Sequence, residues 1–133
     1  MQELEYHNCF VCGKDNPIGM KLEFDYGEGT ATCIWETKVN YEGYPDIIHG
    51  GIVATILDEV MAKAILGGNR EAVTAEMTVK YLKPAKVNQK YKVFGRIISQ
   101  KKRIIECSSY ICDLENEDYV IANAFAKYYQ VNS

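Results

Sequence analysis

The pattern of hydrophobic and polar positions predicts one long helix between two groups of strands. Residues 50–66 carry apolar side chains on nearly every side of a helix, and a helix of this kind is usually buried. Gly67, Gly68 and Asn69 follow it, and glycine readily takes the left-handed conformation that ends a helix. Shorter runs predict strands through alternating polarity or through β-branched and aromatic residues. These runs are residues 21–26, 30–37, 72–82, 90–100, 103–113 and 119–130.

Short turns separate the predicted strands. The Gly27-Glu28-Gly29 segment suits a hairpin. The later runs are joined by residues 83–85, 100–102 and 115–117. Runs of about ten residues joined in this way indicate an antiparallel meander. The order of elements predicts the α+β class, with a curved antiparallel sheet wrapped around one long central helix. A sheet covered on one face leaves an edge and an apolar surface, so we expect a homo-oligomer, either a dimer or a tetramer.

Composition and charge narrow the class of protein. The chain has 133 residues, of which 47% are hydrophobic and 25% are charged, as in ordinary globular proteins. We therefore expect a single domain over residues 1–133, with an irregular lead-in over residues 1–20. The net charge is −3 and no basic run is longer than Lys101-Lys102-Arg103, which argues against a nucleic-acid partner.

The start of the chain and its cysteines predict a cytoplasmic protein. Residues 1–5 are acidic and polar, unlike a signal peptide, and no apolar run approaches the ~20 residues that cross a bilayer. The five cysteines lack the spacing of a disulfide framework, so we expect reduced thiols. Cys9 and Cys12 form a Cys-x-x-Cys pair, but no second pair lies at the spacing of a four-ligand zinc site. We therefore expect no metal, no cofactor and no membrane partner.

The segment His49-Gly50-Gly51 opens the predicted helix and is the first candidate for chemistry. Backbone N–H groups in the first helical turn have no partner within the helix, and the aligned peptide dipoles add positive potential there. Glycines let a ligand approach this backbone without obstruction by a Cβ atom. The segment therefore suits a carbonyl oxygen that becomes negative during acyl transfer.

Asp58 is the second candidate for chemistry. It lies about two turns into the same helix, where an acid among apolar residues is costly unless it is paired, exposed or used. Glu59 has Lys63 four residues later, in the favourable order, whereas Asp58 has alanines four residues to either side. Isolated acids on helices are more often solvated or capping than catalytic. The combination of this acid with the glycine-rich helix start and the strand order favours a catalytic role.

Residues 41–58, with the sequence YEGYPDIIHGGIVATILD, resemble the signature of the hotdog-fold thioesterase superfamily. The similarity is closest to the phenylacetate-pathway type and to the mammalian long-chain acyl-CoA thioesterases. Residues 9–20 resemble the lead-in of the second group, and residues 79–85 resemble the family's strand after the helix. The resemblance implies a hotdog fold and hydrolysis of acyl-CoA to a free carboxylic acid and coenzyme A.

The resemblance also implies a role for each candidate residue. Asp58 corresponds to the acid that acts as general base on water, or as nucleophile. Gly51 corresponds to the position whose backbone N–H polarises the thioester carbonyl, and His49 to the histidine that positions the substrate. Such sites lie at a dimer interface, where Asp58 and His49 can come from different protomers. Gly43 and Ala62 depart from the pattern, because related proteins often carry a polar residue there that helps to hold the attacking water.

Substrate binding has a further set of candidates. Gly50 allows close approach to the helix start. Four basic side chains suit the phosphates of coenzyme A, although lysines at strand ends are often simply solvated. These four are Lys83, Lys101, Lys102 and Arg103.

Three other functions remain open for this sequence. A non-catalytic acyl-CoA-binding or sensing protein on the same fold is slightly favoured by the departures at Gly43 and Ala62. A hotdog dehydratase or hydratase uses a different arrangement of histidine and acid, which the sequence does not show. A purely structural oligomer does not explain Asp58 on an apolar helix.

Overall fold

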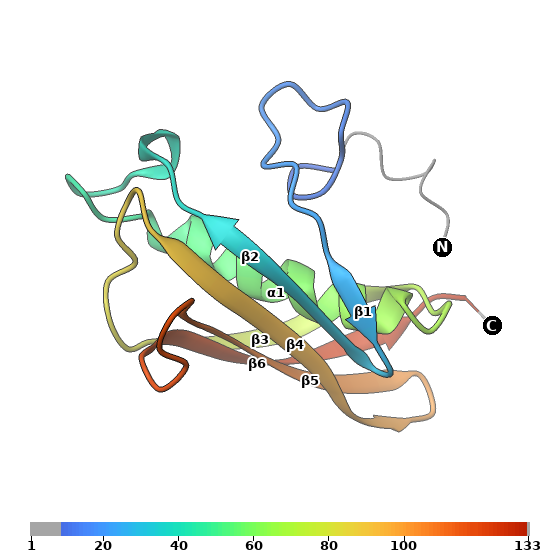
Figure 1. Ribbon diagram of the computed structural model, residues 1–133. Helices are drawn as coiled ribbons and strands as arrows, with labels where there is room; N and C mark the ends of the chain where they lie inside the picture. The colour runs from blue at the N-terminus through green and yellow to red at the C-terminus, as the bar shows by residue number, and fades with distance from the viewer. Residues whose placement is uncertain (1–8, 133) are drawn as a thin grey trace.

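A six-stranded antiparallel sheet curves around one long helix in the computed structural model, which describes residues 9–132 (Figure 1). The helix α1 spans Gly50–Leu66, the range that its apolar pattern predicts. The strands are β1 (Asp25–Gly27), β2 (Thr30–Glu36), β3 (Ala72–Tyr81), β4 (Lys90–Lys101), β5 (Ile104–Asp113) and β6 (Val120–Gln130). A short 3-10 helix, η2 (Val39–Tyr41), lies in the loop before α1. The predicted α+β class is confirmed.

The strand order differs from a simple meander. It runs β1-β2-β4-β5-β6-β3, so the hairpin β1-β2 and the run β4-β5-β6 follow the order of the sequence, whereas β3 does not lie between β2 and β4. β3 pairs with β6 and occupies the edge of the sheet opposite β1. The reason is that α1 separates β2 from β3 and carries the chain across the concave face of the sheet (Figure 1). The meander prediction is therefore wrong for β3.

Two local predictions also need correction. The first strand is Asp25–Gly27 rather than residues 21–26, because Lys21 has a positive φ of 56° that interrupts the extended chain. The backbone around it pairs with the lead-in instead: Leu22 N donates to Val11 O at 2.8 Å. At the end of α1, Gly67 stays right-handed with φ −58°, and Asn69 takes the left-handed conformation with φ 62°. Asparagine is among the few residues that tolerate this conformation.

The hydrophobic core lies between α1 and the concave face of the sheet. Ile56, Leu57 and Val60 of α1 have no exposed surface. At its closest approach the helix touches Gly95 of β4, where a Cβ atom would lie only 2.8 Å from the Val60 carbonyl oxygen. The core explains why the sequence of α1 is apolar nearly all round.

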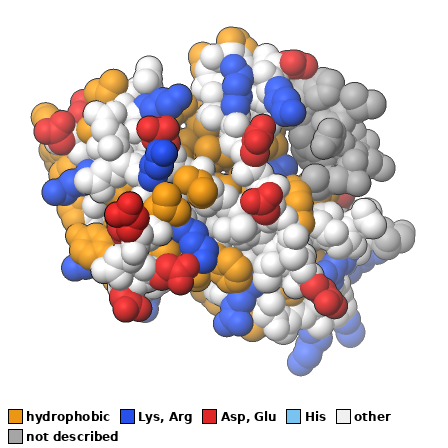
Figure 2. Space-filling model, viewed as in Figure 1, with side chains coloured by type: hydrophobic (Ala, Val, Ile, Leu, Met, Phe, Trp, Pro, Cys, Tyr) orange, Lys and Arg blue, Asp and Glu red, His pale blue; other side chains and the backbone are white. Residues whose placement is uncertain are grey.

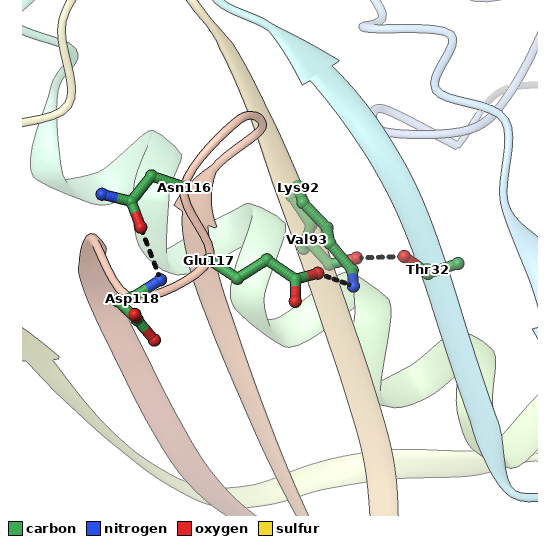
Figure 3. A network of polar contacts seen from close by, with 6 residues as sticks. All are labelled: Thr32, Lys92, Val93, Asn116, Glu117 and Asp118. Atoms are coloured by element: carbon green, nitrogen blue, oxygen red, sulfur yellow. Dashed lines mark hydrogen bonds and ion pairs between the residues drawn. The ribbon is translucent and has the colours of Figure 1, made fainter.

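Polar contacts tie β2 to β4 and fix the turn between β5 and β6 (Figure 3). Thr32 Oγ1 donates to Val93 O at 2.8 Å. Lys92 Nζ pairs with Glu117 Oε1 at 2.5 Å, and Asn116 Oδ1 accepts from the backbone N–H of Asp118 at 3.1 Å.

Acidic and basic side chains are interspersed over the face shown in Figure 2. Among residues 9–132, no helix has the length and apolar character needed to span a bilayer.

Candidate active site

The start of α1 is capped by the imidazole of His49. The backbone N–H of Gly51 donates to His49 Nδ1 at 2.9 Å, and the N–H of Ile52 donates to His49 O at 3.0 Å. The hydroxyl of Tyr81 in β3 donates to Gly50 O at 2.8 Å. His49, Gly50 and Gly51 are all exposed. The sequence predicts the place of this helix start and its exposure to a ligand, but not the cap.

The cap has a chemical consequence for the predicted carbonyl-binding group. The N–H of Gly51 already has an acceptor, so a substrate oxygen can reach it only when the imidazole moves away. Gly43 allows the backbone of His49 to pack closely against the preceding loop, because a Cβ atom at position 43 would lie 3.1 Å from His49 Cα. A larger polar side chain at position 43 would not fit this close contact without a shift of the loop.

Asp58 is held by two hydroxyl groups from neighbouring strands. Tyr128 of β6 donates to Asp58 Oδ1 at 2.6 Å, and Thr74 Oγ1 of β3 donates to the same oxygen at 3.0 Å. Thr74 and Tyr128 are direct cross-strand partners, which places both hydroxyls beside one carboxylate. Burial, followed by the charge of Asp58 and its hydrogen bond, raises the pKa of Tyr128 well above its ordinary value. Tyr128 therefore remains protonated and keeps donating to Asp58.

Sequence reasoning finds Asp58 but misses Thr74 and Tyr128. The acid stands out because its neighbours on the helix offer no partner. The two hydroxyls reach it only through the pairing of β3 with β6, and a meander would have placed β3 elsewhere. Ala62, one turn after Asp58, carries no hydroxyl, and Thr74 and Tyr128 supply hydroxyls to the carboxylate from the sheet instead.

The two parts of the candidate site are well separated within one chain. Gly51 and Asp58 are seven residues apart on α1, which corresponds to about 10 Å along the helix axis. A single thioester carbonyl, a bond of about 1.2 Å, cannot contact both groups in the same copy. Within one chain, the helix start and the acid therefore cannot both contact the same small group.

A cavity opens beside the helix start. It has a volume of about 710 Å³ and lies between the loop that precedes α1 and residues 81–85. His49, Gly50 and Lys83 lie on its wall, together with apolar side chains such as Ile47 and Val53. The cavity is large enough for part of an acyl thioester, and its lining is mostly apolar.

The basic residues fall into two groups at opposite ends of the sheet. The backbone N–H of Lys83 donates to Ile121 O, whereas Arg103 Nη1 donates to Gln130 O at the far end of β6. Nine residues of strand between Ile121 and Gln130 span roughly 30 Å. Lys101 and Lys102 share the turn with Arg103 and are exposed. The structure thus brings Lys83 to the cavity but leaves the other three basic residues remote from it in the same chain.

Sequence comparison shows which known proteins the chain is similar to. Residues 46–119, more than half of the chain, match the profile of the Thioesterase superfamily. The Mus musculus protein named Acyl-coenzyme A thioesterase 13 is 31% identical over 87 residues, which are 64% of this chain and 60% of that protein. The Homo sapiens protein of the same name is 26% identical over 78 residues, which are 57% of this chain and 56% of that protein. The matched part thus spans less than two thirds of these curated relatives.

Solved structures share the fold at low sequence identity. Zebra fish thioesterase superfamily member 2 superposes with a TM-score of 0.79 at 17% identity, covering 96% of this chain and 94% of the other. A hypothetical thioesterase from Streptococcus pneumoniae, solved with coenzyme A, superposes with a TM-score of 0.78 at 17% identity, covering 84% and 87%. The hotdog architecture implied by the sequence resemblance is confirmed.

Proposed function

The chain belongs to the thioesterase superfamily, and we propose that it hydrolyses acyl-CoA to a carboxylic acid and coenzyme A. The observation that carries the proposal is the Asp58 carboxylate, half-buried on an apolar helix and oriented by two hydroxyl donors. The names of the curated relatives and the coenzyme A in the Streptococcus pneumoniae structure support this substrate class.

Asp58 acts as the general base in this proposal. Thr74 and Tyr128 both bond Oδ1, which leaves Oδ2 to accept a proton from water. The water oxygen attacks the thioester carbonyl carbon, and its proton passes to Asp58. The C–S bond then breaks, the sulfur leaves with a proton returned by Asp58, and the free acid and thiol result. The step uses no redox cofactor and no metal.

The start of α1 stabilises the carbonyl oxygen in the same proposal. As the oxygen gains negative charge it takes the place of the His49 imidazole at the N–H of Gly51, where the helix dipole favours an anion. The displaced imidazole orients the substrate from the side of the cavity, and Gly50 leaves room for the approach. Lys83, on the cavity wall, is one candidate contact for the phosphates of coenzyme A.

Two copies of the chain complete one site. Because Gly51 and Asp58 lie about 10 Å apart along the helix, a carbonyl polarised by one helix start must be attacked by water on Asp58 of another copy. β3 supports this arrangement, because among residues 9–132 it pairs only with β6, and it exposes Val73 and Tyr81 by 55% each. Antiparallel pairing of two β3 edges about a twofold axis would bring the helix start of one copy toward the acid of the other. Lys101, Lys102 and Arg103 would then contact phosphate from the second copy.

The free thiols support a proposal about where the protein works. All five cysteines are free in the structure, and we propose that the protein works in the reducing cytoplasm.

The Asp58→Asn substitution tests the hydrolytic function. Release of free thiol from a panel of acyl-CoA esters is followed with a thiol-reactive dye. We expect kcat to fall by about 10²- to 10⁴-fold, because general base catalysis contributes that much. Binding of coenzyme A and the unfolding midpoint should stay unchanged. Asp118→Asn is the matched control, since it makes the same change in the exposed turn between β5 and β6. An unchanged kcat in Asp58→Asn would remove the mechanism.

A second candidate function is acyl-CoA binding without hydrolysis. The observation that favours it is the His49 cap, which occupies the N–H of Gly51. The same assay separates the two functions: a binding protein shows saturable binding of acyl-CoA by calorimetry and no thiol release by the wild-type chain.

A further inference from the structure

Two thiols of the lead-in meet a carboxylate of α1 on a side of the helix that Asp58 does not occupy. Cys9 Sγ lies 3.7 Å from Glu59 Oε2. The sulfur atoms of Cys9 and Cys12 and a carboxylate oxygen of Glu59 all lie within 4.8 Å of one another. Consecutive helical residues point about 100° apart, so Glu59 faces the lead-in while Asp58 faces β3 and β6.

We propose that Cys9, Cys12 and Glu59 bind a zinc ion that fastens the lead-in to α1. In a tetrahedral site with Zn–S of about 2.3 Å and Zn–O of about 2.1 Å, sulfur and oxygen ligands lie roughly 3.6 Å apart. The separation of Cys9 Sγ and Glu59 Oε2 is 3.7 Å, already that of two ligands of one zinc ion. Thiolate ligands select zinc over magnesium or calcium.

The charges around the cluster match a divalent cation. Two thiolates and one carboxylate contribute three negative charges. The side chain of Lys63 is only 8% exposed, and its ammonium pairs with Glu59 Oε2 at 3.6 Å and hydrogen-bonds Cys12. The cluster with Lys63 therefore carries two negative charges once both thiol protons have left for solvent, and a zinc ion brings the sum to zero.

The backbone of the lead-in holds the two cysteines in place for this role. Gly13 N donates to Cys9 O at 2.9 Å, which closes a tight turn with both thiols. Met20 N donates to Phe10 O at 2.8 Å, so the middle of the Cys-x-x-Cys segment is paired with the chain that follows it. Cys9, Cys12 and Glu59 are half-buried rather than sealed, which leaves a fourth position for water and a path for the ion.

The carboxylate of Glu59 distinguishes a metal site from a redox pair. A redox pair needs only its two sulfur atoms, whereas here a carboxylate oxygen lies within 4.8 Å of both of them. The same carboxylate is a good ligand for zinc. The proposal departs from the expectation that the chain binds no metal, because the fold brings Glu59 to the two cysteines, a contact that the cysteine spacing does not reveal.

Metal titration of the reduced full-length protein tests the site. Zinc affinity is measured by competition with a chromophoric chelator, and cobalt(II) serves as a spectroscopic probe. We expect one zinc per chain and the near-ultraviolet charge-transfer absorption of a thiolate–cobalt bond. Zinc should raise the unfolding midpoint, and a chelator should lower it. Cys12→Ser should weaken zinc binding by about 100-fold or more, and Glu59→Gln by about 10-fold or more.

Two control variants make the result specific. Cys107→Ala removes a buried cysteine outside the cluster, and Asp58→Asn changes the adjacent acid on α1. Both should bind zinc like the wild type, even if Asp58→Asn has lost hydrolysis, so the two proposals fail separately. Absence of the thiolate–cobalt absorption in the reduced wild type would overturn the zinc site. Equal zinc affinity in the wild type, Cys12→Ser and Glu59→Gln would also overturn it. A folding defect would weaken zinc binding, so equal affinity cannot be caused by poor folding of a variant.

Discussion

Tyr128 is the residue on which the orientation of the Asp58 carboxylate depends most. It is fully buried and makes the shorter of the two hydrogen bonds to the carboxylate, at 2.6 Å. Burial, and then the charge of Asp58, raise the pKa of Tyr128. The tyrosine hydroxyl therefore keeps its proton while Asp58 is ionised. Tyr128 acts through Asp58 and is a positioning residue rather than a group that touches substrate.

The Tyr128→Phe substitution should therefore lower kcat and leave KM nearly unchanged. A hydrogen bond to a charged group contributes about 1.5–3 kcal/mol, which corresponds to a loss of about 10- to 100-fold. Steady-state kinetics of thiol release measure both constants. Tyr129→Phe is the matched control, because Tyr129 is 47% exposed. An equal loss in both variants, or a change in KM alone, would contradict a positioning role for Tyr128.

At the same scale, the sequence identifies the two acids of α1 as candidates but does not predict which side chains from other elements contact them. The spacing of Glu59 and Lys63 predicts an ion pair, and the structure has it at 3.6 Å. The spacing could not show that Cys9 approaches the same carboxylate, since that contact joins residues fifty positions apart. Local periodicity identifies partners one helical turn away, whereas contacts made by the lead-in and by β6 depend on the whole fold.

At the scale of elements, the close contact of α1 with β4 depends on Gly95. A Cβ atom there would lie 2.8 Å from the carbonyl oxygen and 2.9 Å from the carbonyl carbon of Val60. The backbone of a helix cannot yield as a flexible side chain can, so a methyl group would push the helix away from the sheet.

Gly95→Ala should lower the free energy of unfolding by about 1–3 kcal/mol, the usual cost of overfilling a packed core. Urea denaturation followed by circular dichroism measures this loss. Gly68→Ala provides the control, since Gly68 is exposed and an added Cβ would meet Arg70 at an ordinary 3.4 Å. A Gly95→Ala protein as stable as the wild type would mean that α1 and β4 adjust without cost.

The elements themselves were largely predictable, and their order in the sheet was not. Most residues of α1 are apolar because the helix packs along the concave face of the sheet, and this pattern predicts both ends of the helix. The position of β3 beside β6 leaves no local signal, because β3 has the same strand-forming composition wherever it pairs. That one misplaced strand is also why Thr74 and Tyr128 went unnoticed as partners of Asp58.

At the scale of the whole molecule, the proposed site needs two copies of the chain. The N–H of Gly51 and the carboxylate of Asp58 lie about 10 Å apart along one helix, and each copy would lend one group to its partner. A variant that lacks the N–H and a variant that lacks the acid are then both inactive as pure proteins. Gly51→Pro removes the N–H at a position in the first helical turn, where proline is tolerated. Asp58→Asn removes the acid.

Mixed dimers of these two variants should recover activity. In a mixed dimer about a twofold axis, one site combines the intact Gly51 of one chain with the intact Asp58 of the other, and the second site carries both changes. Random exchange of equal amounts makes half of the dimers mixed, so we expect about a quarter of the wild-type kcat per site. Thiol release is measured after mild unfolding and joint refolding, with each variant refolded alone as the control and light scattering to confirm the dimer. If each chain held a complete site of its own, the mixture would stay as inactive as its components.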